Sequence, residues 1–449
     1  MPDFSHPERE GRTARHAPPI SVAVLVDLEF AEGAGGHVKC WQRFAEAAAE
    51  EAADIDLTVY FLGEEERCIS LGETVRYQLL KPRLGTRRFP FLAQGAGHTD
   101  LAWFHPQLAQ RLSRHDVLHT TDVFAFAATA RRVAQRRRMP MVTSIHTDLP
   151  KFTEIYTGEV VRRLFGNGKV ASLLLDDLKL GGLNARKMAR RVHRMIRHSD
   201  HVMVPHRDDW QRLAPVVGSN RLSLLRRGID IGRFHPSQRD RARLADRFGI
   251  EIDCDVLLFV GRIDESKKAA YAARAARSLI EHGHRLKFLF IGDGAQRQTI
   301  VDILGPNAVL PGPVPQADLA WIYPSADMFV FPSESETVGN VVLEAKASGL
   351  PVLVADAPGP AQLVLKHGVD GLITPTADPA DWTAAIAALL EDGGRRQEMG
   401  RQARIAVETS WPSWGDVLRA DLLPIWRDVA LRREPAQSDL AYRRRLQRA

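Results

Sequence analysis

The stretch DMFVFPSESETVGNVVLEAKASGLPVLVAD, residues 327–356, contains the strongest evidence for the fold. An apolar run of strand length comes first, a polar loop follows, and a helical stretch begins near Gly339 or Asn340. Gly349 is a favourable residue to end that helix, and Pro351 follows just beyond it. The apolar run PVLVAD completes the order strand, loop, helix, strand, which is typical of a parallel βαβ unit.

The same alternation continues on both sides of this stretch, in two successive series of similar size. The first runs from SVAVLVDL at residues 21–28 through DLTVYFLG, DVLHTTD and PMVTSIHTD to DHVMVP at residues 200–205. The second runs from DVLLFVGR at residues 255–262 through LKFLFIGDG, AVLPG and DMFVFPS to GLITP at residues 371–375. We therefore expect an α/β protein of two doubly wound domains that face each other across a cleft, with ligands at the carboxyl ends of the strands.

Composition agrees with a globular protein of more than one domain. The chain has 449 residues, of which 45% are hydrophobic and 26% charged, and its formal net charge is +6. That mild surplus suits an anionic ligand or a membrane surface but is too dilute to indicate a nucleic-acid binder. Three scattered cysteines exclude a disulfide framework and favour a reducing compartment. With no apolar start and no apolar run of about 20 residues, we expect a cytoplasmic protein whose membrane contact, if any, is peripheral.

Two carboxylates flank the expected helix start. Glu336 falls in the loop before the helix, and Glu344 lies about one turn inside it. Backbone amides at a helix start, here Gly339, Asn340 and Val341, are free to receive phosphate oxygens. Carboxylates on each side of such an anion site could accept hydrogen bonds from sugar hydroxyls. The alternative is a solvated acidic loop before a helix that early acids stabilise.

Cations follow another apolar strand in LLFVGRIDESKKAA. Arg262 comes directly after the strand, with Lys267 and Lys268 a few residues on. Cations at a strand's carboxyl end can neutralise a diphosphate, since Arg forks two oxygens and Lys acts as a point charge. The alternative is a pair of surface lysines and an arginine that forms a salt bridge with Asp264 or Glu265.

In chain order, these motifs resemble the retaining nucleotide-sugar glycosyltransferases of family 4, over about residues 20–430. The matching motifs are Gly35-Gly36, His146-Thr147-Asp148, Gly228-Ile229-Asp230 before Phe234, Gly261-Arg262 with Lys267, the FIGDG run, Glu336 with Glu344 after seven residues, Asp370-Gly371, and Trp411 with Trp414. Val338 departs from the family pattern, which often has an aromatic residue there, and Gln362 stands where an acid is common.

The resemblance implies the GT-B fold, two Rossmann-like domains facing across a cleft. The implied division of the chain is a disordered leader at 1–19, an N-terminal acceptor-side domain at 20–228, an interdomain connection at 229–252, a C-terminal nucleotide-sugar-binding domain at 253–410, a helical crossover at 411–431 and a basic tail at 432–449. It further implies transfer of a sugar from a nucleoside diphosphate to an acceptor hydroxyl, with a glycan or lipid-linked acceptor and no nucleic-acid partner.

The resemblance also implies roles for individual residues. Arg262 and Lys267 would hold the diphosphate as it leaves, with Lys268 the alternative phosphate ligand. Glu336 would accept hydrogen bonds from the donor sugar, and His146 would lie near the reacting sugar. The other implied donor contacts are Glu344 at the ribose, Gly35 and Gly36 in the first turn, Asp293 and Gly294 near the nucleotide, and Gly339, Asn340 and Val341 at the helix start.

Other polar motifs are secondary. His119, Asp122 and Asp148 follow strands and could line the cleft, although a lone histidine at a strand end is more often a hydrogen-bonded structural residue. Asp54-Ile-Asp56 and Asp253-Cys-Asp255 match the short aspartate pattern of metal-dependent glycosyltransferases but precede strands. We therefore predict no catalytic metal and no cofactor besides the nucleoside-diphosphate sugar. Arg297 at the third glycine position of Gly292-Asp293-Gly294 argues against an NAD site.

A basic amphipathic helix is predicted from Leu178 to Ser199, where seven basic residues occur and no acid. Such a helix could lie on an anionic membrane, or it could pack its apolar stripe on the domain while its charges face water. Two further alternatives compete with the enzyme: a non-catalytic nucleotide-sugar-binding protein, and a basic membrane or nucleic-acid adaptor that uses residues 179–197 and the Arg-rich tail.

Overall fold

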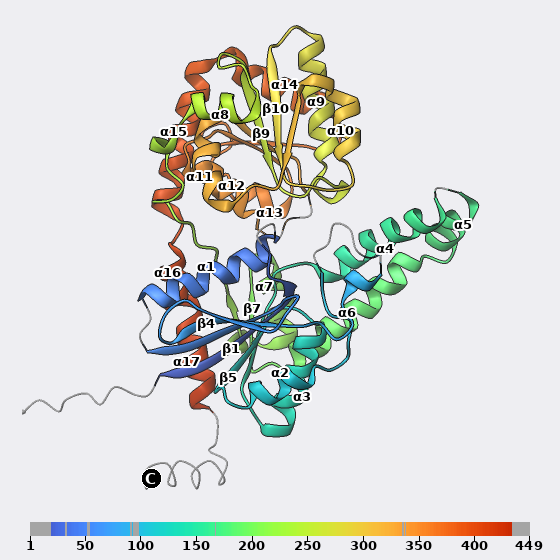
Figure 1. The fold of residues 1–449 in the computed structure, drawn as a ribbon, viewed down its shortest axis with the longest axis vertical. Helices are drawn as coiled ribbons and strands as arrows, with labels where there is room; N and C mark the ends of the chain where they lie inside the picture. Colours follow the sequence, from blue (N-terminus) through green and yellow to red (C-terminus); the bar gives the residue numbers. More distant parts are fainter. Residues whose placement is uncertain are drawn as a thin grey trace, which may run out of the picture.

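The computed structural model describes residues 19–31, 34–51, 54–89, 92, 98–166, 168–334, 336 and 338–432. The predicted leader up to residue 18 and the predicted tail after Arg432 lie outside the described residues. Within the described part of the chain, two sheets form two layered α/β bodies stacked along the long axis (Figure 1). None of the described helices is long and apolar enough to cross a membrane.

The N-terminal sheet has eight strands in the order β3-β4-β2-β1-β5-β6-β7-β8, parallel except for the antiparallel pair β3 and β4. The strands are β1 Ile20–Glu29, β2 Ile55–Leu62, β3 Arg67–Ser70, β4 Val75–Leu80, β5 Val117–Thr120, β6 Met141–Ser144, β7 His201–Val204 and β8 Leu222–Leu224. The helices are α1 Gly36–Glu51, α2 Pro106–Leu112, α3 Ala125–Arg137, α4 Leu149–Phe165, α5 Lys169–Ser172, α6 Leu180–His198 and α7 Arg207–Val217. The apolar runs predicted β1, β2, β5, β6 and β7 correctly.

The C-terminal sheet has six parallel strands in the order β11-β10-β9-β12-β13-β14. The strands are β9 Asp255–Val260, β10 Leu286–Ile291, β11 Ala308–Gly312, β12 Met328–Phe331, β13 Val352–Ala355 and β14 Leu372–Thr374. The helices are α8 Arg241–Phe248, α9 Ala269–Glu281, α10 Arg297–Leu304, α11 Gln316–Ser325, α12 Asn340–Ala347, α13 Pro358–Ala361, α14 Pro379–Glu391 and α15 Gly393–Ser410. Each predicted apolar run of the second series forms a strand here, because strands covered on both faces by helices are almost uniformly apolar.

Both sheets reverse their strand order next to the first strand of the series. In the N-terminal sheet β1 lies between β2 and β5, and in the C-terminal sheet β9 lies between β10 and β12. Loops that leave neighbouring strands in opposite directions at such a point open a crevice at the carboxyl edge of the sheet. Gly35, Gly36, Arg262 and the 332–339 loop all follow strands at these two switch points.

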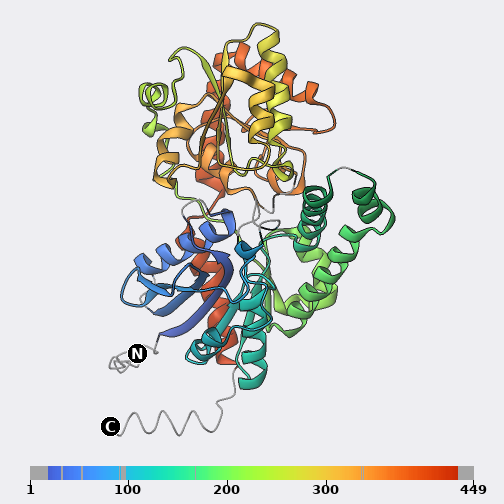
Figure 2. The same ribbon diagram turned by 45° about the vertical axis from the view of Figure 1, so that its right-hand side comes forward.

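The end of the chain returns to the N-terminal body. After α15 the chain turns at Trp411, and α16 Trp414–Val417 and α17 Leu423–Leu431 pack beside the N-terminal sheet (Figure 2). Trp426 is fully buried in the same cluster as β1 and α1 side chains, and the ring of Trp414 meets Phe44 edge-on at 4.9 Å. Asp421 adds a bidentate salt bridge to Arg226, with a shortest N–O distance of 2.7 Å.

The two chain segments that join the bodies touch at Gly228. A Cβ atom at this position would lie 2.5 Å from both the Cα and the backbone nitrogen of Trp414. The next amide, of Ile229, donates to the carbonyl oxygen of Pro412 at 3.1 Å. Glycine is therefore required at residue 228 because two backbones pass each other with no room for a side chain.

We predict that Gly228→Ala destabilises the junction of the two bodies. Forcing a methyl group against backbone costs about 1–3 kcal/mol, so the thermal unfolding midpoint should fall and limited proteolysis near residues 228 and 412 should accelerate. Gly232→Ala is the matched control, since a Cβ there would come no closer than 3.5 Å to another residue's atom. Equal unfolding midpoints for the two variants would contradict the prediction.

Candidate functional site

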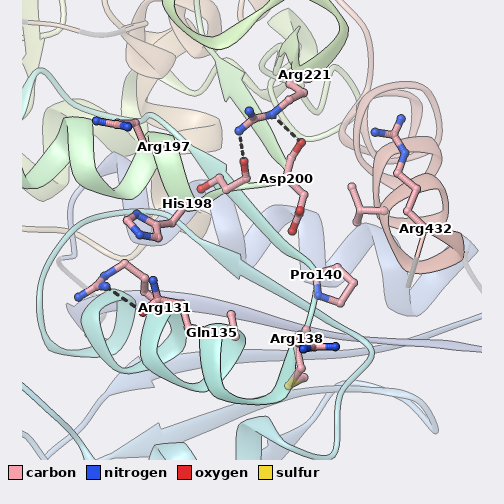
Figure 3. A pocket seen from close by; sticks show the side chains of 13 residues that line it. Arg131, Gln135, Arg138, Pro140, Arg197, His198, Asp200, Arg221 and Arg432 are labelled. Carbon is pink, nitrogen blue, oxygen red and sulfur yellow. Dashed lines mark hydrogen bonds between the residues drawn. The ribbon is translucent and has the colours of Figure 1, made fainter. Parts of the chain in front are cut away.

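Two hollows in the described part of the chain are candidates for a ligand site. One, of about 560 Å³, is lined by five arginines among other residues (Figure 3). It lies at the amino edge of the N-terminal sheet, because Pro140, Asp200 and Arg221 each come just before β6, β7 and β8. The guanidinium group of Arg221 donates to the carbonyl oxygen of Ser199, the residue that ends α6. This hollow is on the edge of the sheet opposite to the one that binds ligands in such folds.

The second hollow, of about 1430 Å³, lies at the carboxyl edge of the C-terminal sheet. Its floor comes from the loops after β9 and β10, with Asp264, Glu265 and residues 293–296. Its other wall is formed by α4, α6 and the turn between them in the N-terminal body. The structure therefore places Asp293 and Gly294 in a cleft between the two bodies, and we take this cleft as the candidate site.

The predicted cations lie at this edge, and each is paired with an acid. Arg262 forms a 2.9 Å salt bridge with Asp264 and donates to Ser266 at 3.0 Å. Lys267 forms an ion pair with Glu336, so the structure joins two residues that the sequence placed in separate motifs. The side chains of Lys267 and Glu336 are only 14% and 18% exposed. The salt bridge between Arg262 and Asp264 matches the alternative interpretation of the sequence. Lys267 does not match that alternative, because it is mostly buried and paired with Glu336.

Lys268 has different partners from Lys267. Its ammonium group lies 2.7 Å from Glu334 and donates to the hydroxyl of Thr376 at 3.1 Å. Its backbone is left-handed, with φ of 52° directly before α9. Of the two lysines, Lys267 is the one in contact with the predicted sugar-side carboxylate.

The helix after the acidic loop begins where the sequence predicts. Gly339 is the residue before α12, with φ of 83°, and among the described residues no side chain caps the helix start. The side-chain oxygen of Asn340 is buried without a hydrogen-bond partner in the described structure. A buried polar atom without a partner costs free energy, so a ligand that donates a hydrogen bond to Asn340 would be favoured at this helix start.

Glu344 lies one turn further along α12. Its carboxylate accepts a hydrogen bond from the hydroxyl of Tyr323 on α11 at 3.0 Å. Burial raises the pKa of Glu344 to about 7, an effect that the Tyr323 hydrogen bond and the charges of Arg43 and Lys39 on α1 only partly offset. Arg43 and Lys39 belong to α1, so charges of the N-terminal body act on this carboxylate of the C-terminal body.

The glycines of the first turn stand open. A Cβ atom at Gly35 or Gly36 would meet no atom of the described residues within 4 Å, apart from its chain neighbours, so packing within the described part of the chain does not require glycine there. Gly294 differs, because its Cβ would lie 2.3 Å from the carbonyl oxygen of Ile263. Glycine at residue 294 thus lets the loops after β9 and β10 touch and fixes the backbone next to Arg262.

His146 lies behind the first turn, in a buried polar cluster. Its ring stacks on His37 at 4.5 Å, its Nε2 atom is in hydrogen-bond contact with Trp41 at 3.3 Å and Ser144 at 2.7 Å, and its Nδ1 atom lies 2.9 Å from a guanidinium nitrogen of Arg227. Burial, together with the neighbouring His37 and Arg227, holds the pKa of His146 well below its usual value. The ring is therefore neutral and both of its nitrogens are engaged within the protein.

The sequence did not indicate Arg227 or Tyr323 as site residues. Arg227 is 7% exposed and its second guanidinium nitrogen is buried without a partner, yet it lies 81 residues from His146 in the chain. Tyr323 belongs to α11, 21 residues before Glu344. Neither stands at a strand end or in a matching motif, so only an unusual position directly before Gly228 could have drawn attention to Arg227.

The second-tier residues make hydrogen bonds within the N-terminal body, and a place for them in the cleft stays a prediction. His119 accepts from the indole of Trp426 at 2.9 Å and contacts Ser144 at 2.9 Å, buried within the N-terminal body. Asp122 accepts from the backbone amides of Asp27 at 2.9 Å and Phe124 at 3.0 Å. Asp148 caps α4 by accepting from the amide of Lys151 at 3.1 Å.

The aspartate pairs that imitate metal motifs are also accounted for. Asp54 forms an ion pair with Arg427 of α17, and Asp253 forms one with Arg285 at 2.9 Å. Both pairs lie at strand starts, as the sequence indicated. Among the described residues, no group of three His, Cys, Asp or Glu side chains is arranged to hold a metal ion.

Comparison with known proteins identifies the family. The family description "Glycosyltransferase Family 4" matches residues 34–233, and "Glycosyl transferases group 1" matches residues 254–392. The chain is 29% identical to sulfoquinovosyl transferase SQD2 of Arabidopsis thaliana over 360 residues, 77% of this chain and 64% of that protein. It is 33% identical to the D-inositol 3-phosphate glycosyltransferase of Thermobispora bispora over 206 residues, 42% of this chain and 47% of that protein.

The fold has close relatives among solved structures. Anabaena Alr3699/HepE in complex with UDP and glucose aligns with 89% of this chain and 97% of its own, at a TM-score of 0.60 and 16% identity. The architecture is that of a GT-B protein, as predicted: two parallel-sheet Rossmann-like bodies with a cleft between them. The chain belongs to the group 1, family 4 glycosyltransferases. The match spans about two thirds of the length of SQD2 and about half of the D-inositol 3-phosphate enzyme.

We predict that the raised pKa of Glu344 makes the ligand-free protein less stable as pH rises. A carboxyl group with a folded pKa of about 7 binds more protons folded than unfolded between pH 4.5 and 7, so stability falls through that window. Glu344→Gln removes this penalty, and its unfolding midpoint relative to wild type should be higher at pH 8 than at pH 4.5. The exposed Glu65→Gln serves as the control. If the difference in unfolding midpoint between Glu344→Gln and wild type does not change with pH, the raised pKa of Glu344 is contradicted.

Proposed function

We propose that this protein is a retaining glycosyltransferase that moves a sugar from a nucleoside diphosphate to an acceptor hydroxyl. The observation that carries the proposal is the convergence of Arg262, the Lys267–Glu336 pair and the uncapped start of α12 at one switch point. Family membership and the GT-B architecture support it. Cations for a diphosphate and carboxylates for sugar hydroxyls are what such a donor demands.

In the proposed donor complex, the diphosphate would replace Asp264 and Glu336 as the partner of Arg262 and Lys267. Lys267 and Glu336 neutralise each other in the structure. A bound donor would take Lys267 and Arg262 onto its phosphate oxygens and leave Glu336 to accept from sugar hydroxyls. Glu344, in its ionised form, would accept from the ribose hydroxyls. The amides of Gly339, Asn340 and Val341, with Asp293 and Gly294, would contact the nucleotide.

Bond cleavage makes the leaving diphosphate more negative and gives the sugar oxocarbenium character. Arg262 and Lys267 stabilise the leaving group, and one fixed donor is worth on the order of 3 kcal/mol in comparable sites. These cations supply the charge that a metal ion would otherwise provide, so we propose metal-independent transfer. The open first turn at Gly35 and Gly36 would leave space for the diphosphate from the opposite body.

In this proposal His146 acts through its backbone, and its ring takes no part in proton transfer. Both of its ring nitrogens are already engaged and its pKa is depressed, so the ring is a poor proton donor. Its backbone carbonyl oxygen is the better candidate to face the developing positive charge. Closing of the two bodies would exclude the water that could hydrolyse the donor. We propose attack on the same face that the diphosphate leaves, without a covalent intermediate.

For the acceptor we propose a hydroxyl of a glycan or lipid-linked molecule, used in glycolipid, lipid-linked glycan or polysaccharide synthesis. Among the relatives, the name of SQD2 describes a sulfoquinovosyl transferase, and that of the Thermobispora protein a D-inositol 3-phosphate glycosyltransferase. We place the protein in the cytoplasm and, for work on a lipid-linked acceptor, at the inner face of the membrane. A nucleotide-sugar-binding protein without turnover is the alternative that the kinetic test below would reveal.

Thermal unfolding with UDP, GDP and ADP tests the donor site. A nucleotide at about a hundred times its Kd stabilises the folded protein by about 2.7 kcal/mol. We expect one of the three to raise the unfolding midpoint of wild type and of the exposed control Arg277→Ala, and to have no effect on Glu344→Ala. Because the carboxylate must be ionised, nucleotide affinity should weaken by up to about tenfold per pH unit below pH 7. No shift with any nucleotide, or an undiminished shift in Glu344→Ala, would contradict the site.

Donor-dependent turnover tests the chemistry separately. We expect Arg262→Ala to lower kcat by about 100-fold with a smaller change in donor affinity, because its charge acts on the leaving group. Arg277→Ala, which removes an exposed arginine paired with Glu281, should turn over like wild type. Nucleotide binding without any transfer in wild type would favour the binding-protein alternative.

A further inference from the structure

A helical arm projects sideways from the N-terminal body. It consists of residues 149–198: α4, α5, a short π-helical turn at Leu173–Asp177, and α6, with α4 and α6 packed along each other. Both views show the far end of the arm, at α5, well away from the two sheets (Figures 1 and 2). Such an extension is exposed on most sides. The residue types on its surface therefore indicate what kind of partner it could bind.

The arm has little core of its own. Only six of its residues are buried: Gly158, Val161, Ala171, Gly181, Met195 and Ile196. Near its base, the predicted amphipathic stripe of α6 packs on the body, where Met188 and Val192 lie against the N-terminal core. The packing alternative from the sequence is therefore correct for that stripe, and the stripe is not available to a partner.

The far end of the arm instead exposes a second apolar set. We call residues 164–183 the tip. Of the fifteen large hydrophobic residues that are exposed in the described part of the chain, six fall within these twenty positions: Leu164, Phe165, Val170, Leu173, Leu178 and Leu183, each 46–55% exposed. Isolated exposed apolar residues are ordinary, but a concentration of this kind marks a contact surface.

The arm also carries the whole charge surplus of the protein. Residues 149–198 contain eleven Lys and Arg and four Asp and Glu, a surplus of seven, whereas the entire chain has a net charge of +6. The remainder of the chain is therefore negative by one charge. All eleven cations are exposed, from Lys151 at the start of α4 to Arg197 near the end of α6. Apolar side chains among exposed cations match the pattern of segments that lie in an anionic membrane surface.

We propose that the tip of the helical arm docks on an anionic lipid membrane, with its apolar side chains in the interfacial layer and the cations of the arm against lipid headgroups. A second copy of the chain is a poorer occupant, because two arms with a surplus of seven positive charges each would repel. Nucleic acid is also poorer, since it would satisfy the cations and leave the six apolar side chains in water.

The arm also links this surface to the candidate site. The 1430 Å³ cleft is lined on one side by Leu175, Leu178 and Leu183 of the arm, and on the other by the Asp264–Glu265 and 293–296 loops. A molecule whose tail stays in the membrane at the tip could thus reach the site with its head. This step rests on the proposed function, and it identifies the acceptor as a membrane-held amphiphile whose hydroxyl enters through the cleft.

Vesicle co-sedimentation tests the docking surface on the full chain. The probes are vesicles of phosphatidylcholine alone and of phosphatidylcholine with phosphatidylglycerol. We expect binding to the anionic vesicles only, weakened by raising NaCl from 0.1 to 1 M, since screening shortens from about 10 to about 3 Å. Neutralising one cation should lower the partition coefficient by about fivefold, so Lys169→Ser with Lys187→Ser should lower it by about 25-fold. Phe165→Ser with Leu173→Ser should lower it by about tenfold.

Matched variants control for charge and hydrophobicity. Arg285→Ser with Arg401→Ser removes the same charge elsewhere, and Val216→Ser with Ile252→Ser removes apolar side chains that are 58% and 62% exposed. Both controls should bind vesicles like wild type. Equal binding to neutral and anionic vesicles, equal losses in controls and arm variants, or salt-resistant self-association in place of vesicle binding would overturn the proposal.

The nucleotide shift separates this proposal from the proposed function. None of the four substituted arm residues lines the cleft, so the arm variants should keep the wild-type nucleotide-induced shift, which also shows that they are folded. Nucleotide binding without vesicle binding refutes the arm alone. Vesicle binding without nucleotide binding or turnover refutes the transferase alone. Transfer to a water-soluble acceptor that exceeds transfer to a vesicle-held one would overturn the acceptor assignment.

Discussion

The candidate donor site depends on the neutralisation of its own cations. Arg262, Lys267 and Lys268 lie within seven residues of one another at the end of one strand, and without counter-charges they would repel. Acids from the same loop and from the loop after β12 meet them: Asp264, Glu336 and Glu334. These pairs hold two loops of the C-terminal sheet together. A diphosphate donor would compete with these carboxylates for the three cations. The site would therefore favour a ligand that also offers hydrogen-bond donors to the displaced carboxylates.

The part of the N-terminal body behind the first turn is held by buried hydrogen bonds. The indole of Trp426, in the returning helix α17, donates to His119, which contacts Ser144, which in turn contacts His146. Breaking any of these buried contacts would leave a polar atom without a partner, at a cost of about 1–3 kcal/mol. These contacts join the last helix of the described residues to the polar cluster behind the first turn. The two crossing segments near Gly228 and Trp414, where backbones touch, are the direct link from this unit to the C-terminal body.

Much of the fold could be predicted from sequence, because strands buried on both faces form uninterrupted apolar runs. The edge strands β3 and β8 were not predicted, since RCIS and LSL are short and partly polar. The cations and Glu336 could be found because the chain places them directly after strands at a switch point. Arg227 and Tyr323 could not, because tertiary packing alone brings each to its partner. The exposed apolar tip was also missed, since α6 shows its packed stripe more clearly in sequence than the residues that stay in water.

The distribution of charge decides what the basic character of the chain means. A surplus of six positive charges fits an anionic donor as well as a membrane when only the sum is known. The structure separates these possibilities, because the cations of the candidate site are paired with acids while the surplus lies on the helical arm. Beyond a Debye length of about 8–10 Å exposed charges are screened, so an arm that projects from the body acts chiefly on whatever its own surface meets. The arm is therefore a major source of the basic isoelectric point, together with the Arg-rich tail at 432–449. In the proposed donor complex, recognition would depend on the local exchange of ion pairs.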